Sequence, residues 1–351
     1  ALTVHGMSHI FTGFNSPRIA SPLTPGDRPV SIRFDSQQWA LILGGSSGFG
    51  LATAKKLARH GMSIAVVHRD RRGAMKTIEV GFDEIRHSDG EGDFVSFNLD
   101  ALSDEGRDTV IGDLRERLGS SGRVRMLMHS IAFGNLRLLA PLDPDYGDAS
   151  ARARQKLSER LGISSEQLTE ALRAVFETGD ETDTGALASL APPPTYNTDV
   201  HLEDEDFART VYSMGTSLAT WTHAVFEAGL FADDARVLSM TSEGNEVALR
   251  GYAAVAAAKC ALESVSRAIA VEYAPYGIRS NVVQAGVTDS AALRLIPGST
   301  HMKAAAALRN PFGRLTTAAE AADFICLLCT DEARWVNGTV IRVDGGEHIS
   351  G

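Results

Sequence analysis

The chain has 351 residues, 44% of them hydrophobic, which is enough for one large α/β domain or two small ones. It holds no apolar run near the ~20 residues that span a bilayer, no recognisable secretory signal and only three cysteines, so we expect a cytoplasmic protein with no membrane partner. The whole net charge of −10 falls between residues 142 and 206, which hold 15 acidic and 5 basic side chains, and no basic stripe indicates nucleic acid.

The beginning of the chain predicts a dinucleotide-binding unit. Residues 1–36 are rich in Ser, Pro and Gly and are expected to form an N-terminal arm. A buried strand is expected at 39–43 and a helix at 51–60. The loop between them is glycine-rich, which lets the backbone approach a pyrophosphate at the amino end of the helix. Its glycines are Gly44, Gly48 and Gly50.

The second predicted strand, 64–67, ends at a cluster of charged residues. An acidic residue at this point would hold the ribose hydroxyls of NAD, whereas Arg69 offers a cation to the 2′-phosphate of NADP. We therefore predict NADP, with NAD as the alternative because Asp70 is the next residue.

The third predicted strand, 94–97, runs into Asp100 and Ala101. Here the Asp100 carboxylate can accept a hydrogen bond from the adenine amino group of the cofactor. The alternative is that Asp100 caps the helix expected at 104–118. A fourth strand is expected at 124–128.

The segment from about 140 to 200 interrupts the alternation of strands and helices and carries the acidic excess. It predicts two short helices, 151–161 and 165–177, the second with a capping box from Ser164 and Gln167. An insertion after the fourth strand would leave the sheet at its carboxyl edge, where such folds bind ligands. It would roof the site, decorate its rim or form an oligomer contact, and we favour the lid.

The remaining elements complete an α/β fold with a doubly wound parallel sheet of the Rossmann type, one domain over 37–348 with a helical insertion. Cys326 and Cys329 have metal-ligand spacing but lie in an apolar helix with no second pair, so we predict core packing and no metal site. The later helices are expected near 204–228, 252–273 and 317–329, and the later strands at 236–240, 279–283 and 339–343.

Tyr252 and Lys259 are the predicted catalytic pair. They are seven residues apart on one expected helix, which returns both side chains to within ~20° of the same face, and only Ala and Val lie between them. A phenol there donates a hydrogen bond or a proton, while the ammonium lowers the pKa of the phenol and holds a cofactor ribose. A chance surface pair is the alternative.

Over residues 37–348 the chain resembles the short-chain dehydrogenase/reductase family, in its glycine loop, Asn98-Leu-Asp100, the Tyr/Lys helix and the ending Val336–Gly346. Within the family it looks most like the enoyl-acyl-carrier-protein reductases. Ordinary members place Lys four residues after Tyr, and the run His129-Ser-Ile-Ala-Phe133 also has the enoyl reductase form. One departure is that Ser242 and Glu243 stand where these reductases carry a second aromatic residue.

The resemblance implies an NAD(P)H-dependent reductase of an α,β-unsaturated carbonyl or acyl-thioester substrate, in which Tyr252 stabilises the enolate oxygen and Lys259 binds the nicotinamide ribose. It also implies a homo-oligomer, a tetramer or a dimer. The further cofactor contacts that it implies are Ser46, Ser47 and Phe49 at the pyrophosphate, Ser130, Ile131 and Ala132 beside the cofactor, and Gly286, Val287 and Thr288 at the nicotinamide and its phosphate.

Two other functions stay open. Ser239 lies thirteen residues before Tyr252, where ordinary family members keep a catalytic serine, which favours a ketoreductase or alcohol dehydrogenase. A non-catalytic dinucleotide-binding protein is the third, although Tyr252, Lys259 and an apolar stretch at 291–312, suited to covering a substrate, argue against it. The acidic segment would repel an acidic acyl carrier protein, which favours a coenzyme A ester or a free enone.

Overall fold

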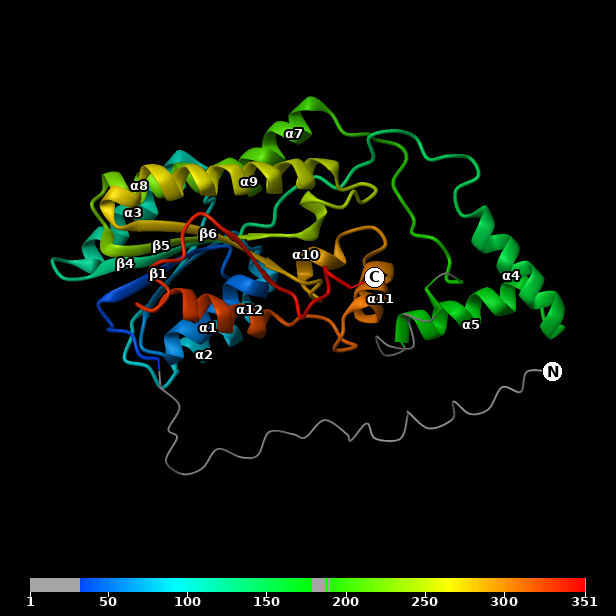
Figure 1. The fold of residues 1–351 in the computed structure, drawn as a ribbon, viewed down its shortest axis with the longest axis horizontal. Helices are drawn as coiled ribbons and strands as arrows, with labels where there is room; N and C mark the ends of the chain where they lie inside the picture. Colours follow the sequence, from blue (N-terminus) through cyan, green and yellow to red (C-terminus); the bar gives the residue numbers. More distant parts are fainter. Residues whose placement is uncertain (1–31, 179–186, 189, 351) are drawn as a thin grey trace, which may run out of the picture. The chain divides into compact units, whose positions relative to one another are not determined.

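A computed structural model describes residues 32–178, 187–188 and 190–350, and within this part of the chain seven strands form one parallel sheet (Figure 1). Their order across the sheet is β3-β2-β1-β4-β5-β6-β7. The strands are β1 Gln38–Leu43, β2 Ser63–His68, β3 Phe94–Asn98, β4 Arg123–His129, β5 Phe231–Thr241, β6 Ile278–Ala285 and β7 Val340–Val343.

Helices cover both faces of the sheet, as the sequence predicts. Figure 1 shows α3, α8 and α9 over one face, and α1, α2 and α12 over the other, where α1 packs against α12. The helices are α1 Gly48–Arg59, α2 Met75–Arg86, α3 Asp104–Leu118, α4 Asp148–Leu161, α5 Ser165–Thr178, α7 Asp204–Val211, α8 Ser217–Glu227, α9 Ala253–Glu272, α10 Ala291–Arg294, α11 Ser299–Arg309 and α12 Ala318–Leu328.

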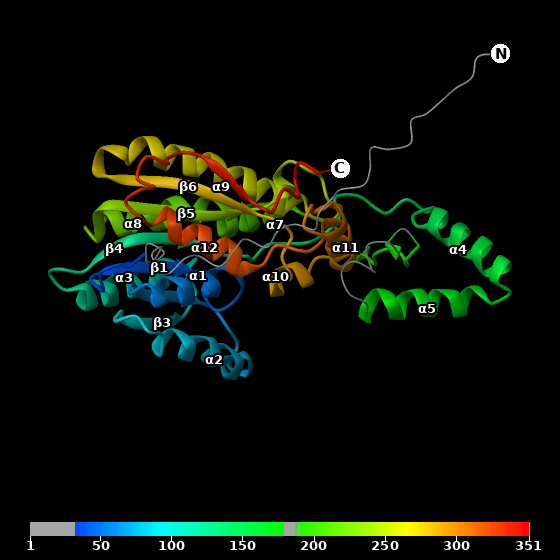
Figure 2. The same ribbon diagram turned by 60° about the horizontal axis from the view of Figure 1, so that its bottom comes forward.

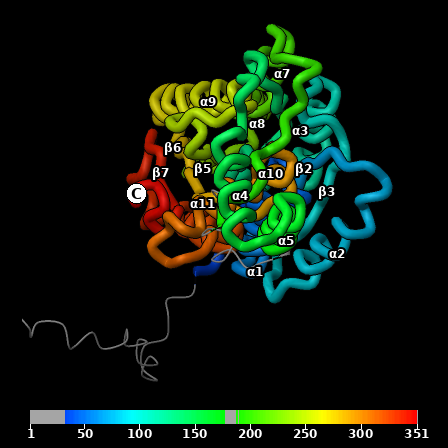
Figure 3. The backbone as a smooth tube through the Cα atoms, turned by 90° about the vertical axis from the view of Figure 1, so that its right-hand side faces the viewer, coloured from blue at the N-terminus to red at the C-terminus, as the bar shows by residue number. Residues whose placement is uncertain are grey.

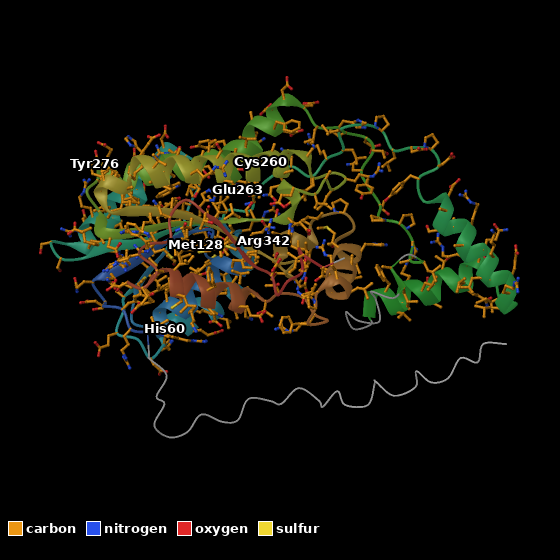
Figure 4. The ribbon with its side chains drawn as sticks, in the orientation of Figure 1. His60, Met128, Cys260, Glu263, Tyr276 and Arg342 are labelled. Atoms are coloured by element: carbon orange, nitrogen blue, oxygen red, sulfur yellow. The ribbon has the colours of Figure 1, made fainter. Side chains whose placement is uncertain are left out.

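The central strands are buried because their residues are apolar on both faces. Trp39 to Leu43 of β1 and Ile64 to Val67 of β2 are almost fully buried, and Met128 of β4 lies in the middle of the fold (Figure 4). Trp221 of α8 is fully buried against this sheet and donates its indole N–H to the carbonyl of Ala101. Continuous apolar strands of this kind are typical of parallel sheets covered on both faces.

The chain reverses direction across the sheet between β1 and β4. From β1 it proceeds through β2 to β3 at one edge, and β4 then returns to pair with the other side of β1. After β1 the chain continues to β2 and after β4 it continues to β5, on opposite sides of this central pair. Ligands of doubly wound folds bind at this switch point.

The predicted strands and helices are confirmed with boundary shifts of a few residues, and the helix at 104–118 is confirmed at both ends. Helix α2 fits the predicted alternation of strands and helices. The sequence did not predict helices α10 and α11, nor a π-helical turn at Tyr212–Thr216 that divides the long helix predicted near 204–228. The described residues include no helix long and apolar enough to cross a membrane. Most of the predicted N-terminal arm, 1–36, lies outside the described residues.

Between β4 and α7 the chain forms the two helices predicted there, α4 and α5. The second begins with the predicted capping box, since the Ser164 amide donates to the Gln167 side chain (3.0 Å) and the Gln167 amide donates to the Ser164 hydroxyl (3.1 Å). Figures 1 and 2 show both helices beyond α11, on the side away from the sheet. Residues 140–200 are called the α4–α5 segment below.

Candidate functional site

A cavity of about 450 Å³ opens at the carboxyl edge of the sheet. Residues that follow β1, β2, β4, β5 and β6 line it, so it lies at the switch point of the strand order. Most of the predicted site residues meet in this one cavity: Gly44, Ser46, Ser47, Gly48, Phe49, Arg69, Ser130, Ile131, Ala132, Tyr252, Lys259, Gly286, Val287 and Thr288. Gly50, Asp100 and Ala101 are not among the residues that line it.

The glycine loop is shaped by close backbone approaches. Gly44 has φ +83°, and a Cβ atom on it would lie 2.5 Å from the Ser130 carbonyl oxygen. A Cβ atom on Gly50 would lie 2.2 Å from the carbonyl oxygen of Gly44, so this glycine is needed under the loop rather than at the cavity. Only glycine fits both positions, and the two loops at the switch point therefore touch.

The amino end of α1 suits a pyrophosphate. The N-cap residue, Ser47, makes no side-chain hydrogen bond to the first turn of the helix, and Gly48 and Phe49 line the cavity at this point. The first amide groups of a helix have no partners within the helix and carry its positive partial charge. The close backbone approach at the glycines, the uncapped amides and the cavity beside them therefore suit the phosphates of a dinucleotide.

Arg69 and Asp70, which follow β2, line another part of the cavity. The Arg69 guanidinium donates to the Asp100 carboxylate (2.8 Å), stacks 4.7 Å from the centre of the Phe133 ring, and leaves half of its side chain exposed. Asp70 also lines the cavity, and its carboxylate lies 2.9 Å from Nδ1 of His68. A cation and a carboxylate therefore stand side by side, as the two cofactor alternatives require.

Asp100 does not cap the helix after it, so that alternative is wrong. Its second carboxylate oxygen accepts from the Leu102 amide (2.9 Å), and Ser103 caps α3 by accepting from the Gly106 amide (3.0 Å). Ala101 is buried in the core. Neither Asp100 nor Ala101 lines the cavity, and the Asp100 carboxylate is already bound to Arg69. The expected contact with adenine would therefore have to form outside the cavity.

Tyr252 and Lys259 both reach the cavity and are both buried, with exposed fractions of 8% and 7%. Tyr252 is the residue before α9 and has φ −113° and ψ 4°, so the expected helix begins one residue later than predicted. The phenol oxygen lies 3.3 Å from the Ser242 hydroxyl. The Lys259 amine donates to the carbonyl oxygen of Met240 in β5 (2.8 Å).

Burial dominates the protonation of both groups. It raises the pKa of the Tyr252 phenol, with the Ser242 hydroxyl acting in the opposite direction, so the net pKa is raised where the sequence predicted a lowered one. Burial lowers the pKa of the Lys259 amine to about 8, although the charge of Glu263 raises it. Glu263, on α9 in Figure 4, accepts hydrogen bonds from Thr241 and Asn245 (2.6 Å each). At neutral pH the phenol is therefore a neutral donor and most of the amine is charged.

His129, at the end of β4, is buried near the cavity. Its Nε2 lies 2.8 Å from the Ser217 hydroxyl, which follows the π-helical turn, while Nδ1 finds no hydrogen-bond partner in the described part of the chain. Burial and the neighbouring charge of Lys259 lower the pKa of the imidazole to about 3. It is a neutral, buried group and does not line the cavity.

Two site residues were missed from the sequence. Ser242, not Ser239, faces Tyr252; the Ser239 hydroxyl is buried and has no hydrogen-bond partner among the described residues. Glu347 is 2% exposed, accepts from the Val287 amide (3.1 Å) and pairs with Arg309 (3.1 Å). In the sequence Ser242 stands out only because an aromatic residue is missing there, and no spacing rule indicates Glu347.

The cavity wall next to Tyr252 is apolar. Met214 and Val255 pack with the Tyr252 ring, and Ile296 and Leu249 lie against this cluster. The apolar stretch expected at 291–312 lines the cavity through α10 and the turn after it, and through Met302 of α11. A substrate group bound here would thus be desolvated next to the phenol.

No described residue of the α4–α5 segment lines the cavity, so the lid that the sequence favoured is not what this part of the chain forms. The segment packs instead on the outer side of α11, through Phe176 and Ala191. Figure 3, viewed from that side, shows α4 and α5 in front of α10 and α11.

Comparison with protein families gives two matches that together cover most of the chain. Residues 163–348 match the family model described as enoyl-(acyl carrier protein) reductase, and residues 38–144 match the model described as short chain dehydrogenase. The first match alone covers more than half of the chain.

Three relatives illustrate the range of similar proteins. An enoyl-acyl-carrier-protein reductase (NADH) of Aquifex aeolicus is 34% identical over 115 residues, 33% of this chain and 43% of the relative, so less than half of its length is matched. The 1-cyclohexenylcarbonyl-CoA reductase of Streptomyces collinus is 26% identical over 321 residues, 90% of this chain and 88% of the relative. The 3-oxoacyl-acyl-carrier-protein reductase of Escherichia coli is 28% identical over 186 residues, 53% and 73% of the two chains.

A solved structure shares the fold. The crystal structure of the enoyl-acyl-carrier-protein reductase (NADH) from Aquifex aeolicus superposes with a TM-score of 0.64 at 21% identity, over 91% of this chain and 98% of that one. The sheet and its flanking helices thus have the arrangement found in that enzyme.

Proposed function

Because this chain belongs to the short-chain dehydrogenase/reductase family of oxidoreductases, we propose that it is an NADP-dependent enoyl reductase, acting on the carbon–carbon double bond of an α,β-unsaturated carbonyl or thioester. One observation carries the proposal: Tyr252 and Lys259, seven residues apart, line a single cavity whose wall beside the phenol is apolar. Ordinary family members space this pair by four residues, and neither residue has such a partner here.

The cofactor would lie along the switch point. Its pyrophosphate would meet the amides at the start of α1, and its nicotinamide end would meet Gly286, Val287 and Thr288. The Arg69 guanidinium, half exposed beside the adenosine end, is the group that favours a 2′-phosphate and hence NADP. NAD is the alternative, because the Asp70 carboxylate could instead accept from the ribose hydroxyls.

The reduction begins with a hydride, which a bound nicotinamide dinucleotide would supply to the β-carbon of the unsaturated substrate, and ends with a proton from solvent on the α-carbon. Between these steps negative charge develops on the substrate carbonyl oxygen, and the Tyr252 hydroxyl donates a hydrogen bond to it, held in place by burial and by Ser242. The Lys259 cation strengthens this effect in a desolvated site and would hold the ribose hydroxyls. The apolar wall excludes water from the reacting group.

The substrate proposed is a coenzyme A thioester or a free enone. The relative that matches 90% of this chain carries a coenzyme A thioester in its name, which supports the first. The acidic excess between residues 142 and 206 also disfavours an acidic carrier protein as the donor of the acyl group. Homo-oligomerisation, as a tetramer or dimer, and a cytoplasmic location stay predictions.

A ketoreductase is the second candidate, and Ser242 is the observation that favours it. A serine hydroxyl 3.3 Å from the phenol is the arrangement that would bind and polarise a ketone oxygen together with Tyr252. The similarity to a 3-oxoacyl-acyl-carrier-protein reductase agrees with this candidate. The two candidates use the same cavity and differ in the carbon that receives the hydride.

Product analysis on a cyclic enone and on crotonyl-coenzyme A tests the proposal. Each substrate is incubated with NADPH and, separately, with NADH, and the oxidation of the cofactor is followed by its absorbance. The saturated ketone and butyryl-coenzyme A are the expected products, formed faster with NADPH. An allylic alcohol from the enone, with no reaction on the thioester, would establish the ketoreductase. Binding of both cofactors without turnover of any substrate would refute both.

A further inference from the structure

Helix α11 is held by different parts of the chain at its two ends. Near its C-terminus, Arg309 donates to the Glu243 carboxylate (2.7 and 2.9 Å) and to Glu347 (3.1 Å). Ala306 and Ala307 pack with Leu315 in a small core cluster next to Val287. The main domain therefore fixes this end of the helix.

The N-terminal half of α11 is held by the α4–α5 segment. The Phe176 ring of α5 lies 4.7 Å from the His301 ring, centre to centre, and Phe176 forms a buried cluster with Ala191 and Ala304. Ala304 is fully buried, and the two buried residues that it clusters with, Phe176 and Ala191, both belong to the α4–α5 segment. A contact of this kind contributes mainly through the apolar area it removes from water.

The chain after α5 adds a second contact, at the turn that precedes α11. Gly298 has φ +81°, and a Cβ atom on it would lie 2.7 Å from Cγ of Pro194. The proline ring thus lies directly on the backbone of this turn. Pro193 lies in the same way against Gly147, where α4 begins, so the segment is closed on itself as well as on α11.

A third contact reaches the residues before the phenol. Tyr196 lies beside Gly251, 3.7 Å from the position of a Cβ atom there, and its ring meets that of Tyr146 at 5.9 Å. The guanidinium of Arg250 stacks over the Tyr146 ring at 5.0 Å. Both ends of the α4–α5 segment therefore converge on the two residues immediately before Tyr252.

The contacts above hold residues 291–304, and these residues form part of the apolar wall of the cavity beside Tyr252. Leu293, Ile296 and Met302 line the cavity, and Ile296 packs against the cluster that contains Tyr252. Helix α10 has only four residues, and helices this short are not stable by themselves. The position of the wall thus depends on what covers it from outside.

We propose that the α4–α5 segment is a brace: it fixes the stretch 291–304 against Tyr252 from outside the cavity and thereby sets the size of substrate that fits, with Phe176 and Pro194 as positioning residues. The inference rests on the proposed function only in taking the cavity at Tyr252 as the substrate site. It assigns the segment a role in specificity although it touches no reacting atom.

Hydrogen–deuterium exchange on the full-length protein tests the brace without any substrate. In Phe176→Ala, amides of residues 296–304 are expected to exchange about tenfold faster than in the wild type, because local opening costs less. Exchange in β6 is expected to stay unchanged. The matched control is Val175→Ala, which alters the neighbouring residue on α5, whose side chain is 41% exposed, and is expected to leave 296–304 unchanged. Equal exchange of 296–304 in all three proteins would overturn the brace.

Substrate selection gives the second readout. With Phe176→Ala, the KM for small enoyl thioesters is expected to rise about tenfold while the KM for NADPH does not change, as expected for a lost positioning contact. If Phe176→Ala does not fold, Pro194→Ala is measured in the same two ways, and unchanged exchange and KM in it would also overturn the inference. Faster exchange in a protein that reduces no enoyl compound would support the brace and refute the proposed function.

Discussion

The hydroxyls of Ser242 and Tyr252 lie 3.3 Å apart, although the two residues are ten positions apart and belong to different elements. Ser242 follows β5 and Tyr252 precedes α9, so the contact joins the end of a strand to the start of a helix at the rim of the cavity. It fixes the direction of the phenol, and it gives the site a second hydroxyl.

Tyr252→Phe is expected to lower kcat/KM for enoyl reduction about 10²- to 10³-fold, because it removes the donor to the oxygen on which charge develops. The affinity for NADPH, measured by fluorescence titration, is expected to be unchanged, since the hydroxyl is assigned to the substrate. Turnover within about threefold of the wild type would contradict this role.

Ser242→Ala separates the two candidate functions. For an enoyl reductase we expect a loss of only a few-fold in kcat, because Ser242 orients the phenol and Tyr252 carries the stabilisation. For a ketoreductase, in which Ser242 would itself bind the ketone oxygen, the loss should reach about 10²-fold. Ser239→Ala is the control, and it should be nearly silent because that hydroxyl has no partner within the described residues and does not line the cavity. An effect of Ser239→Ala larger than that of Ser242→Ala would reverse this assignment.

Lys259→Met is expected to abolish activity and yet raise the melting temperature at pH 7. Burial lowers the pKa of this amine from 10.5 to about 8, so below pH 8 the folded protein carries a buried charge that the unfolded chain keeps in water. That difference destabilises the fold by about 3 kcal/mol at neutral pH and disappears as the pH rises from 8 towards 10.5. The loss of the bond to Met240 offsets part of the gain.

Thermal unfolding of the wild type and of Lys259→Met at pH 7 and pH 10 checks this sign. The stability advantage of the variant should be largest at pH 7 and should shrink at pH 10. An advantage that grows with pH would show that the amine is not held at a lowered pKa.

Arg69→Gln is expected to change cofactor preference and leave the chemistry intact. A charged hydrogen bond to a phosphate contributes about 1.5–3 kcal/mol, so KM for NADPH should rise about tenfold to a hundredfold while KM for NADH changes little. Steady-state kinetics with each cofactor measure the ratio. Arg69→Gln also breaks the ion pair with Asp100. The control for that loss is Asp100→Asn, which removes the carboxylate charge but keeps Arg69. If both variants alter NADPH and NADH alike, Arg69 has no part in the preference.

The sheet was predictable because its strands are short apolar runs separated by helical stretches. In the structure every residue of β2 is buried, and so is every residue after the first in β1 and β4. The glycine loop was predictable for a related reason, since close backbone approach at Gly44 and Gly50 admits no side chain. Spacing along one helix likewise indicated that Lys259 and Tyr252 would share a face, even though the helix begins after the phenol.

Contacts between distant elements could not be predicted in the same way. Ser242 rather than Ser239 meets the phenol because the path of the loop after β5 decides it, and no periodic pattern encodes that path. Glu347 reaches Val287 across 60 positions. The prediction of a lid was wrong for a similar reason. The sequence indicates that the α4–α5 segment leaves the sheet at the carboxyl edge. The direction that the segment then takes depends on side chains such as Phe176, whose partner lies on α11.

The uncapped amino end of α1 would couple the stability of the fold to the concentration of a bound dinucleotide. Within the described residues Ser47 does not cap this helix, so the helix that packs against α12 begins with amides that an anionic ligand would satisfy. Dinucleotide at about a hundred times its Kd would add ~2.7 kcal/mol to the free energy of unfolding. The resistance of the protein to heat and proteolysis would then increase with the concentration of the proposed dinucleotide.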